Sequence, residues 1–342
     1  MNSVLTSTPV SAPARVPRLG FLGVGWIGLL RLQSLARSGA GTIAAVADPV
    51  AECRHEARRA APSCALVATL DELLTLELDG IVIATPSALH AEQAVHALEH
   101  GLAVFSQKPL GRTAAETRRV IAAARAADRL LAVDLSYRHT QALRRVRDLV
   151  RSGAIGGVHA VDLVFHNAYG PSRAWARDPA LAGGGCVIDL GVHLVDMLHW
   201  VLNRPAIVHV ASALYARGQR LPPRAPGECE DFVLATLELS GGCTARIACS
   251  WEASIGRGAI IEALFHGAHG TAAFRNVNGS FFDFTAELYH GAESETLSEP
   301  PDDWGGGALV DWTRRLADDP HFDASVEALV DVAATLDRML GR

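Results

Sequence analysis

Three residues, Lys108, Asp189 and His193, are of the types that move protons between an enzyme and its substrate. Lys108 follows the apolar run 102–105 and stands directly before Pro109. If that run is a strand of an open parallel sheet, Lys108 lies beyond its carboxyl end, where ligands bind in such sheets. The ammonium group can then polarise a substrate C–O bond, and a nearby cationic ring would lower its pKa and help it relay a proton. The structural alternative is a surface lysine.

Asp189, His193 and Asp196 are spaced at i, i+4 and i+7, which places them on one face of a helix. A carboxylate one turn from a histidine can orient the imidazole and stabilise its charged form, as an acid–base catalyst needs. We therefore expect Asp189 to assist His193. Structural alternatives exist for both acids. Asp189 could support the helix start after the glycine triplet 183–185, and Asp196 could pair with a backbone group or an arginine.

The turn Gly23-Val24-Gly25-Trp26-Ile27-Gly28 lies between an apolar run and a helical pattern. Gly23 permits a tight turn, Gly25 lets the backbone approach a pyrophosphate, and Gly28 lets helix and strand pack closely. The helix N-terminus adds amide groups and a partial positive charge. In this context the motif predicts that the chain binds a nicotinamide dinucleotide.

Asp48 stands 20 residues after Gly28, at the end of the next apolar run. A carboxylate at this place can accept hydrogen bonds from both hydroxyls of the adenosine ribose, and it repels a 2′-phosphate. The position therefore favours NAD(H) over NADP(H), although NADP stays possible because Arg54 is close in sequence. The alternative for Asp48 is a turn residue before Pro49.

The elements that must position these residues follow from the spacing of apolar side chains. Short runs that are apolar throughout alternate with helical patterns up to residue 133, which predicts a doubly wound parallel sheet covered on both faces. The expected strands are 19–23, 43–47, 80–84, 102–105 and 130–133, and the expected helices are 26–37, 50–59, 88–99 and 114–126.

After residue 136 strands follow strands, which predicts an α+β domain with a large, mostly antiparallel open sheet. The expected helices are 141–151, an amphipathic 187–201 and a final 324–339, and the β-type runs lie near 159–165, 206–215, 232–239, 243–250, 258–266, 271–274 and 281–288. We therefore expect a flexible tail (1–17), a dinucleotide-binding Rossmann domain (18–137) and a substrate-binding and oligomerisation domain (138–342).

The composition disfavours other classes of protein. The chain has 342 residues and a formal net charge of −6, without a basic stripe for a nucleic acid. Its six cysteines show no paired spacing, which is typical of a reduced, cytoplasmic protein. No apolar run approaches the ~20 residues of a membrane span, and residues 1–17 lack the pattern of a signal peptide. No histidines and acids outside the motif have the spacing of metal ligands.

Further stretches complete a pattern that resembles the Gfo/Idh/MocA family (glucose–fructose oxidoreductase / inositol dehydrogenase). These stretches are Ala84-Thr85-Pro86-Ser87-Ala88-Leu89-His90, Ser106-Gln107-Lys108-Pro109-Leu110, Trp175-Ala176-Arg177-Asp178-Pro179 and 183–196. With the glycine turn they stand in the family's order from about residue 18 to 205. The resemblance implies an NAD(P)-dependent dehydrogenase or reductase that transfers hydride between nicotinamide and a CH–OH carbon of a sugar, polyol or related cyclic compound. It also implies a homodimer or homotetramer.

The resemblance assigns roles to residues as well. It implies that Lys108 and His193 share proton transfer and that Asp189 assists. The implied cofactor contacts are Gly23, Gly25, Trp26, Ile27, Gly28, Asp48, Thr85, Pro86, His90, Gln107 and Lys108. The implied substrate contacts are Lys108, Arg138, Arg173, Trp175, Asp189 and His193. Many family members have glutamate where this chain has Gln107, so the amide keeps hydrogen-bonding capacity but removes a charge beside Lys108.

Two other functions fit the same motifs. In one, the dinucleotide oxidises and then re-reduces one carbon during a glycoside cleavage or elimination, with no net change in the nicotinamide absorbance. In the other, the chain is a non-catalytic sensor that binds dinucleotide and a partner protein. The presence of Lys108, Asp189 and His193 together argues against the sensor.

Overall fold

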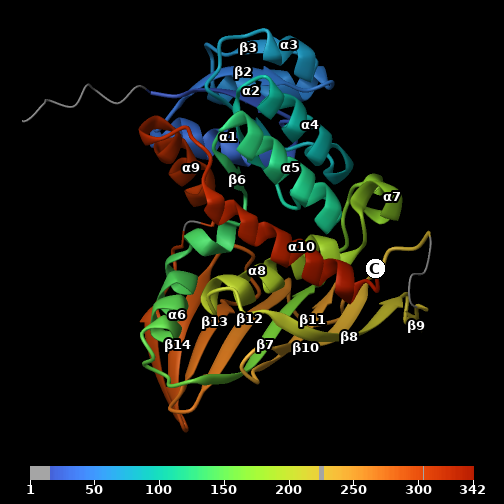
Figure 1. Cartoon of the computed structure of the whole chain (residues 1–342), viewed down its shortest axis with the longest axis vertical. Helices are drawn as coiled ribbons and strands as arrows, with labels where there is room; N and C mark the ends of the chain where they lie inside the picture. The colour runs from blue at the N-terminus through green and yellow to red at the C-terminus, as the bar shows by residue number, and fades with distance from the viewer. Residues whose placement is uncertain (1–15, 223–226, 303) are drawn as a thin grey trace, which may run out of the picture.

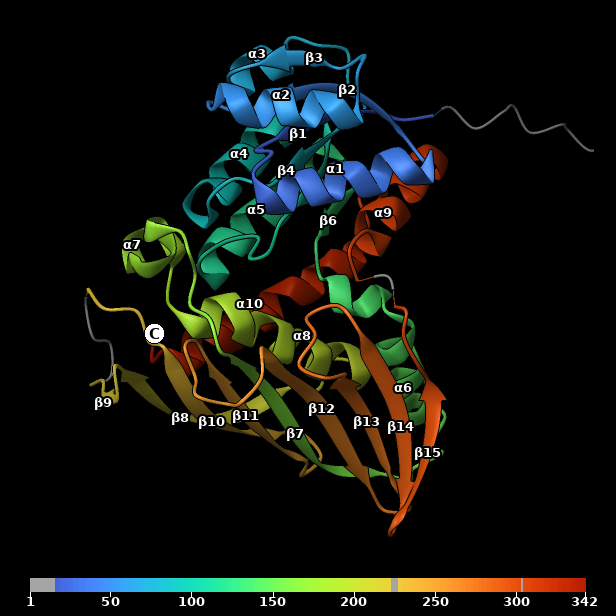
Figure 2. The same cartoon turned by 180° about the vertical axis from the view of Figure 1, so that it is seen from behind.

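The computed structural model describes residues 16–222, 227–302 and 304–342. Its upper half is the Rossmann body and its lower half carries a large sheet, with helices between the two (Figures 1 and 2). Most of the expected tail, residues 1–15, lies outside the described residues. Pro17, the last residue of the expected tail, belongs to the folded structure, because its carbonyl accepts a hydrogen bond of 2.8 Å from the backbone N–H of Thr42.

The Rossmann body contains a six-stranded sheet in the order β3-β2-β1-β4-β5-β6, with every neighbouring pair parallel. The strands are β1 (Arg18–Leu22), β2 (Thr42–Ala47), β3 (Ala65–Val67), β4 (Gly80–Ile83), β5 (Ala103–Ser106) and β6 (Leu131–Val133). The helices are α1 (Trp26–Ser38), α2 (Ala51–Ala60), α3 (Leu70–Leu74), α4 (Ser87–Glu99) and α5 (Ala114–Ala127). The parallel sheet confirms the prediction, and β4 and β5 are buried along their whole length, as strands covered on both faces must be.

The lower body contains a nine-stranded sheet in the order β15-β14-β13-β12-β7-β11-β10-β8-β9. Among the strand pairs of the described residues only β7–β11 is parallel, so the prediction of a mostly antiparallel sheet is confirmed. The strands are β7 (Val158–Asn167), β8 (Ile207–Ala216), β9 (Gln219–Arg220), β10 (Phe232–Leu239), β11 (Thr244–Ser250), β12 (Ala259–Gly267), β13 (Thr271–Asn276), β14 (Phe284–His290) and β15 (Glu293–Ser298).

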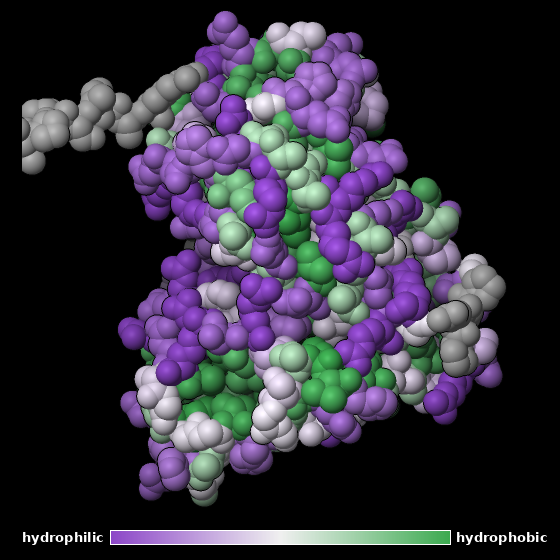
Figure 3. Space-filling view, viewed as in Figure 1, coloured by the Kyte–Doolittle hydropathy of each residue, from purple (hydrophilic) through white to green (hydrophobic). Residues whose placement is uncertain are grey.

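One face of this sheet packs against helices and the other does not. In β10 the residues alternate between buried and exposed, with Val233, Ala235 and Leu237 buried and Leu234 exposed. The covering helices are α6 (Gln141–Arg151), α8 (Val192–Val201) and α10 (Ala328–Met339). Hydrophilic residues cover most of the molecular face in Figure 3, and hydrophobic side chains form separate patches on both halves.

The helix expected over 187–201 differs from the prediction in two ways. It starts as a π-helical turn, Val187–Gly191, before α8, and almost all of its residues are buried rather than those of one face. It lies between the sheet and α10, so every side of it meets protein. The stretch Pro179–Val201 is in fact long and apolar enough to cross a membrane by length and composition, but 89% of its most apolar window is buried, as in the core helix of a folded domain.

The segment after β15 returns to the Rossmann body. Helix α9 (Gly307–Asp318) was not predicted, and it packs against α1 and β5. Its residue Trp312 is 1% exposed and its ring centroid lies 5.6 Å from that of Phe105. The expected boundary at residue 137 therefore does not divide the chain into two contiguous bodies. A short 3-10 turn, Ala324–Glu327, then leads into α10, which packs against both α5 and α8.

Candidate active site

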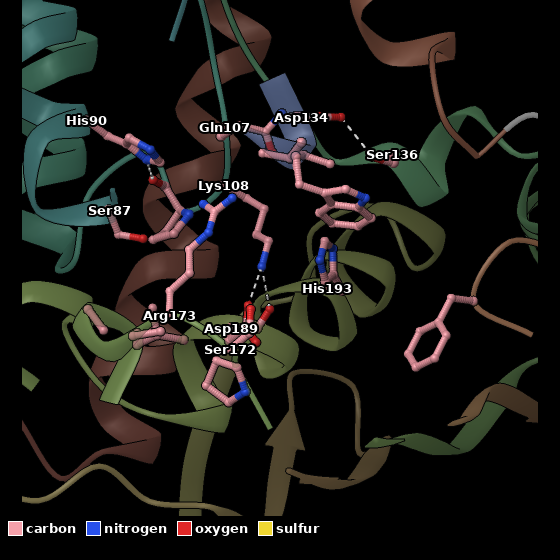
Figure 4. Close-up of a pocket in the computed structure, with 18 of the residues that line it drawn as sticks. Ser87, His90, Gln107, Lys108, Asp134, Ser136, Ser172, Arg173, Asp189 and His193 are labelled. Atoms are coloured by element: carbon pink, nitrogen blue, oxygen red, sulfur yellow. Dashed lines mark hydrogen bonds and ion pairs between the residues drawn. The ribbon is translucent and has the colours of Figure 1, made fainter. Parts of the chain in front are cut away.

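A cavity of about 510 Å³ lies between the two bodies, beyond the carboxyl ends of β4, β5 and β6. Its walls come from both halves of the chain. The Rossmann side contributes the glycine turn and the ends of the strands, and the other side contributes the loop after β7, the start of α8 and the loops around β11 and β14. In Figure 4, Lys108 reaches across this cavity to Asp189, while Arg173 and Ser172 lie on the wall of the second body.

Lys108 and Asp189 form an ion pair across the cavity. The Lys108 Nζ donates hydrogen bonds to Asp189 Oδ1 at 2.7 Å and to the Asp189 carbonyl at 2.8 Å. The second carboxylate oxygen accepts a hydrogen bond of 3.0 Å from Trp251 Nε1. Burial alone would raise the pKa of Asp189, but the Lys108 charge and these hydrogen bonds outweigh it and lower that pKa. Asp189 is therefore held as a carboxylate.

The sequence contains 31 lysines and arginines, and Lys108 is the only lysine among them. An arginine would form the same ion pair, but its guanidinium does not release a proton, whereas an ammonium group does when its surroundings demand it. A single lysine, in a chain that otherwise uses arginine, at the centre of this cavity therefore favours a role in proton transfer. This signal was available in the sequence and adds to the position of Lys108.

His193 lies beside the ion pair but is not bonded to Asp189. Its side chain is 7% exposed, and its Nδ1 is buried without a hydrogen-bond partner among the described residues. Burial, reinforced by the positive charge of Lys108, lowers the pKa of His193 to about 3. The carboxylate oxygens of Asp189 accept hydrogen bonds from Lys108 and Trp251, and no hydrogen bond joins Asp189 to His193. The charge of Asp189 raises the pKa of His193, as expected, but burial and the Lys108 charge outweigh it. His193 is a neutral imidazole in this arrangement.

On the Rossmann side of the cavity, Arg31 and Asp134 line the wall and form a second ion pair that the sequence did not suggest. The Arg31 Nε donates to Asp134 Oδ2 at 2.5 Å, and the two side chains are 2% and 1% exposed. Gln107 Nε2 also donates to Asp134 Oδ2, and Ser136 Oγ donates to Asp134 Oδ1 at 2.7 Å. Burial raises the pKa of Asp134, but Arg31 and the hydrogen bonds lower it overall. The amide of Gln107 thus acts as a donor to a neighbouring carboxylate and makes no bond to Lys108.

The glycine turn has the geometry that a dinucleotide needs. Gly23 has a φ of 83°, and a Cβ on Gly28 would lie 2.2 Å from the carbonyl oxygen of Gly23. Asp48, at the end of β2, is 7% exposed. Its two carboxylate oxygens accept hydrogen bonds of 2.9 Å from the backbone N–H groups of Val24 and Val50. Asp48 therefore supports the glycine turn directly, a role that its spacing alone did not reveal.

Most of the other expected cofactor contacts line the cavity: Trp26, Ile27, Thr85, His90 and Gln107. Pro86 does not line the cavity and occupies the N-cap position of α4. His90 is 1% exposed, and its two ring nitrogens lie 2.7 Å from the carbonyl oxygens of Pro109 and Thr85. It therefore joins the loops after β4 and β5 and positions Lys108 from behind.

The three expected substrate contacts outside the central group have different places. Trp175 and Arg173 line the cavity. Arg138 is not among the lining residues; its Nε donates to Asp196 Oδ2 at 2.8 Å, in a bidentate pair with a carboxylate that is 2% exposed. The structural alternative for Asp196, an arginine partner, is confirmed, and the prediction that Arg138 lines the cleft is wrong.

Aromatic side chains form the remaining wall, and sequence reasoning missed them. They are Tyr137, Phe165, Trp251, Phe281, Phe282 and Trp304. The Tyr137 ring lies edge-on to His193, with 4.9 Å between ring centroids. These residues come from five separate segments, so no local spacing could have grouped them. No cluster of three or more His, Cys, Asp or Glu residues suited to a metal ion occurs in the described part of the chain.

Comparisons with known proteins agree with this architecture. A family model described as "Oxidoreductase family, NAD-binding Rossmann fold" matches residues 17–135, and a model of the GFO/IDH/MocA C-terminal domain matches residues 143–273. The rhizopine catabolism protein MocA of Rhizobium meliloti is 31% identical over 57% of this chain and 61% of its own length. An inositol 2-dehydrogenase of Leifsonia xyli is 30% identical over 72% of this chain and 70% of its own length.

The chain spans 42–61% of the length of the first three curated relatives it matches. Among solved structures, GenD2 from gentamicin A biosynthesis, in complex with NAD, superposes with a TM-score of 0.80 at 24% identity, covering 98% of each chain, which shows a shared fold. The two matched family models, the inositol dehydrogenase relative and the layout of both sheets lead to one conclusion. The chain is a member of the GFO/IDH/MocA oxidoreductase family and carries its NAD-binding Rossmann domain.

Proposed function

We propose that this chain is an NAD(P)-dependent dehydrogenase or reductase that interconverts a secondary alcohol and a ketone on a sugar, polyol or related cyclic compound. The observation that carries the proposal is the group formed by Lys108, Asp189 and His193 in one cavity beside the glycine turn. The names of relatives such as inositol 2-dehydrogenase support the same class of substrate.

When bound, the nicotinamide accepts or supplies the hydride, and the protein contributes position, electrostatics and proton transfer. In the oxidative direction the substrate carbon loses a hydride and its hydroxyl loses a proton, so that C=O replaces CH–OH. Lys108 Nζ gives two of its three N–H groups to Asp189, and the third is available to the substrate oxygen. A charged Lys108 can protonate that oxygen during reduction, and Asp189 holds the ammonium in place between turnovers.

The neutral state of His193 defines its part. A neutral imidazole can accept a hydroxyl proton through its free nitrogen, whereas a charged one cannot. The low pKa of His193, about 3, means that it holds such a proton only while a compensating negative charge, such as a substrate alkoxide, is near. We therefore assign acceptance of the hydroxyl proton during oxidation to the neutral imidazole of His193, which passes it on, and donation of a proton to the substrate oxygen during reduction to Lys108.

The test is a screen of polyols and sugars for reduction of NAD, followed by three variants. Lys108→Ala and His193→Ala should lower turnover by orders of magnitude with nearly unchanged dinucleotide affinity. Lys108→Arg keeps the positive charge beside Asp189 but cannot release a proton, so it should be as inactive as Lys108→Ala. Wild-type turnover rates in these variants would contradict the proposed mechanism. A substrate that turns over without a net absorbance change would instead favour the elimination or glycoside-cleaving alternative.

We also propose that Arg173 binds the cofactor rather than the substrate. Its Nη2 lies 3.1 Å from the position that a Cβ on Gly25 would occupy, at the N-terminus of α1. Two positive groups, the guanidinium and the helix end, thus face the same space, and Arg173 has no carboxylate partner among the described residues. A pyrophosphate between them would satisfy both.

A comparison of adenosine with ADP tests this role, because only ADP carries the pyrophosphate that Arg173 would bind. Loss of one charge-assisted hydrogen bond costs about 1.5–3 kcal/mol, or roughly ten- to a hundred-fold in affinity. Arg173→Ala should weaken ADP by that factor and leave adenosine unchanged in titration calorimetry. Arg177→Ala is the matched control, because Arg177 lies in the same loop but pairs with Glu252. An equal loss of affinity for ADP and adenosine, or no loss for either, would contradict the pyrophosphate contact and leave Arg173 as a substrate contact.

We also propose a preference for NAD(H) and a homo-oligomeric state, and each can be tested directly. Asp48 carries the preference for NAD(H), so Asp48→Asn, which keeps a hydrogen-bond acceptor but removes the charge, should raise NADP affinity relative to NAD about ten-fold. A homodimer or homotetramer should be visible by light scattering at micromolar concentration.

A further inference from the structure

Most polar side chains that line the cavity are already bonded to one another. Arg31 is the clearest case, because its Nε bonds Asp134, its Nη2 bonds Ser136 at 2.9 Å and its Nη1 bonds the carbonyl of Gly305. Gln107 also donates to Asp134. This network occupies the donors that would otherwise be offered to a substrate.

Two further polar lining residues are engaged in the same way. Thr85 Oγ1 donates to Gln93 at 2.5 Å, and both nitrogens of His90 contact backbone carbonyls. At the reacting centre, Lys108 and His193 are left for a substrate. Ser87, Ser172 and Arg173 also line the cavity, and their side chains have no hydrogen-bond partner among the described residues.

Another part of the wall is aromatic. Phe282 and Trp304 form an edge-to-face pair with ring centroids 5.4 Å apart, and Phe282 is 46% exposed at the rim. Phe165 lies beside His193, with 6.3 Å between ring centroids. A wall of this kind removes apolar surface from water and stacks against flat groups, and its aromatic carbons cannot hydrogen-bond to hydroxyls. The indole N–H of Trp304 is the one polar group of the Phe282–Trp304 pair, and it is buried without a hydrogen-bond partner among the described residues.

A fully hydroxylated ring fits such a wall poorly. Inositol or a free hexose would place several hydroxyls against aromatic carbon, and each buried hydroxyl without a partner costs free energy. An apolar substituent in the same place would gain free energy from burial and stacking. The mismatch therefore selects against the most polar members of the proposed substrate class.

Resting on the proposed function, we infer that the substrate is a glycoside with an apolar ring as its aglycone. The sugar carbon that reacts lies at Lys108 and His193, and the aglycone ring lies against Phe282 and Trp304 at the rim of the cavity. Hydroxyls beyond the reacting centre point to the open side, where water can solvate them. The substrate is thus recognised by its chemistry at one end and by its apolar surface at the other.

The experiment compares phenyl and methyl glucosides, in both anomers, with myo-inositol. Initial rates with NAD give kcat/KM, and titration calorimetry against the enzyme saturated with NADH gives Kd without turnover. We expect the better phenyl glucoside to exceed its methyl counterpart by at least about ten-fold in both quantities, as aromatic stacking and burial require. Myo-inositol should be the poorest of the three.

Two variants locate the aglycone. Phe282→Ala should bring the phenyl-to-methyl ratio toward one, because it removes one face of the aromatic pair. Tyr169→Ala is the control, since Tyr169 is an aromatic residue that is 63% exposed and is not among the residues lining the cavity. That variant should leave the ratio unchanged.

The outcomes separate the inference from the function it rests on. Methyl glucoside or inositol equal to phenyl glucoside in both assays would overturn the inference, even with rapid turnover. A preference for phenyl glucoside in binding without any NAD reduction would support the proposed aglycone site and overturn the dehydrogenase assignment. A preference for phenyl over methyl glucoside that persists in Phe282→Ala would place the aglycone elsewhere and refute the site proposed at Phe282 and Trp304.

Discussion

His193 should make the stability of the folded chain fall as the pH is lowered. Its pKa is about 3 in the folded chain, against an ordinary value of 6.5 that we take for the unfolded chain, because burial and the charge of Lys108 disfavour the imidazolium. Between these values the unfolded chain binds a proton that the folded chain does not. The contribution is therefore fully present above about pH 6.5 and is progressively lost below it.

The size of the effect follows from the two pKa values. Over the interval from about pH 7 to about pH 5, the unfolded state gains about 2 kcal/mol from protonation of this one residue. The side chain is 7% exposed, so solvent screening reduces this figure little. The change over this interval is set by the pKa of the unfolded chain, because the folded-state pKa of about 3 lies well below the interval.

Urea denaturation of wild type and His193→Gln at several pH values measures the effect. The quantity of interest is the difference in pH slope between the two proteins, since the substitution also changes the free energy of unfolding at every pH. The pKa values of His90, His139 and His199 are lowered by burial as well, but these residues titrate in both proteins and cancel. Parallel slopes for wild type and His193→Gln would refute the assignment of a neutral, buried imidazole.

Three further predictions concern the scaffold. Gly28→Ala should abolish dinucleotide binding in a fluorescence titration, because its Cβ would lie 2.2 Å from a backbone oxygen, whereas Gly157→Ala, with open space around the glycine, should bind normally. Asp134→Asn leaves the guanidinium of Arg31 buried without its charge partner and should lower the free energy of unfolding by about 3–5 kcal/mol in urea; a loss below about 1 kcal/mol would mean that water reaches the pair. Trp312→Ala should cost about 3–5 kcal/mol through the cavity it leaves, while Trp26→Ala, at a residue that is 64% exposed, should change stability by less than about 0.5 kcal/mol.

The sequence predicted the Rossmann body well because its strands are buried on both faces and read as continuous apolar runs. Strand β3 escaped this pattern, since Ala65 is exposed and the next two residues are only half-buried at the edge of the sheet. Helix α6 was predicted with its observed bounds, because its apolar positions recur at helical spacing between a Thr140 cap and a glycine turn. In α8 and the π-helical turn before it, burial on all sides removed the polar stripe that would have marked an amphipathic helix.

The site was predictable as a set of residues but not as a set of bonds. The family resemblance grouped Lys108 with Asp189 and His193, and all three line the cavity. Helical spacing, however, paired Asp189 with His193, whereas its carboxylate bonds to Lys108 and Trp251. The deciding partner is Trp251, which stands 62 residues further along the chain at the end of β11, and no local pattern connects the two. Arg138 shows the converse, because the resemblance implied a substrate contact, whereas its guanidinium forms an ion pair with Asp196.

The return of α9 to the Rossmann body has a consequence for any movement of the cleft. The chain passes between the two bodies after β6, again before α9, and a third time along α10, which contacts both. Opening the cavity must therefore bend three segments together, which confines the bodies to a small rotation instead of a free swing on one linker. For the same reason a fragment ending at residue 137 would expose the surface that Trp312 covers, so neither half can be detached and still report on how the whole molecule opens.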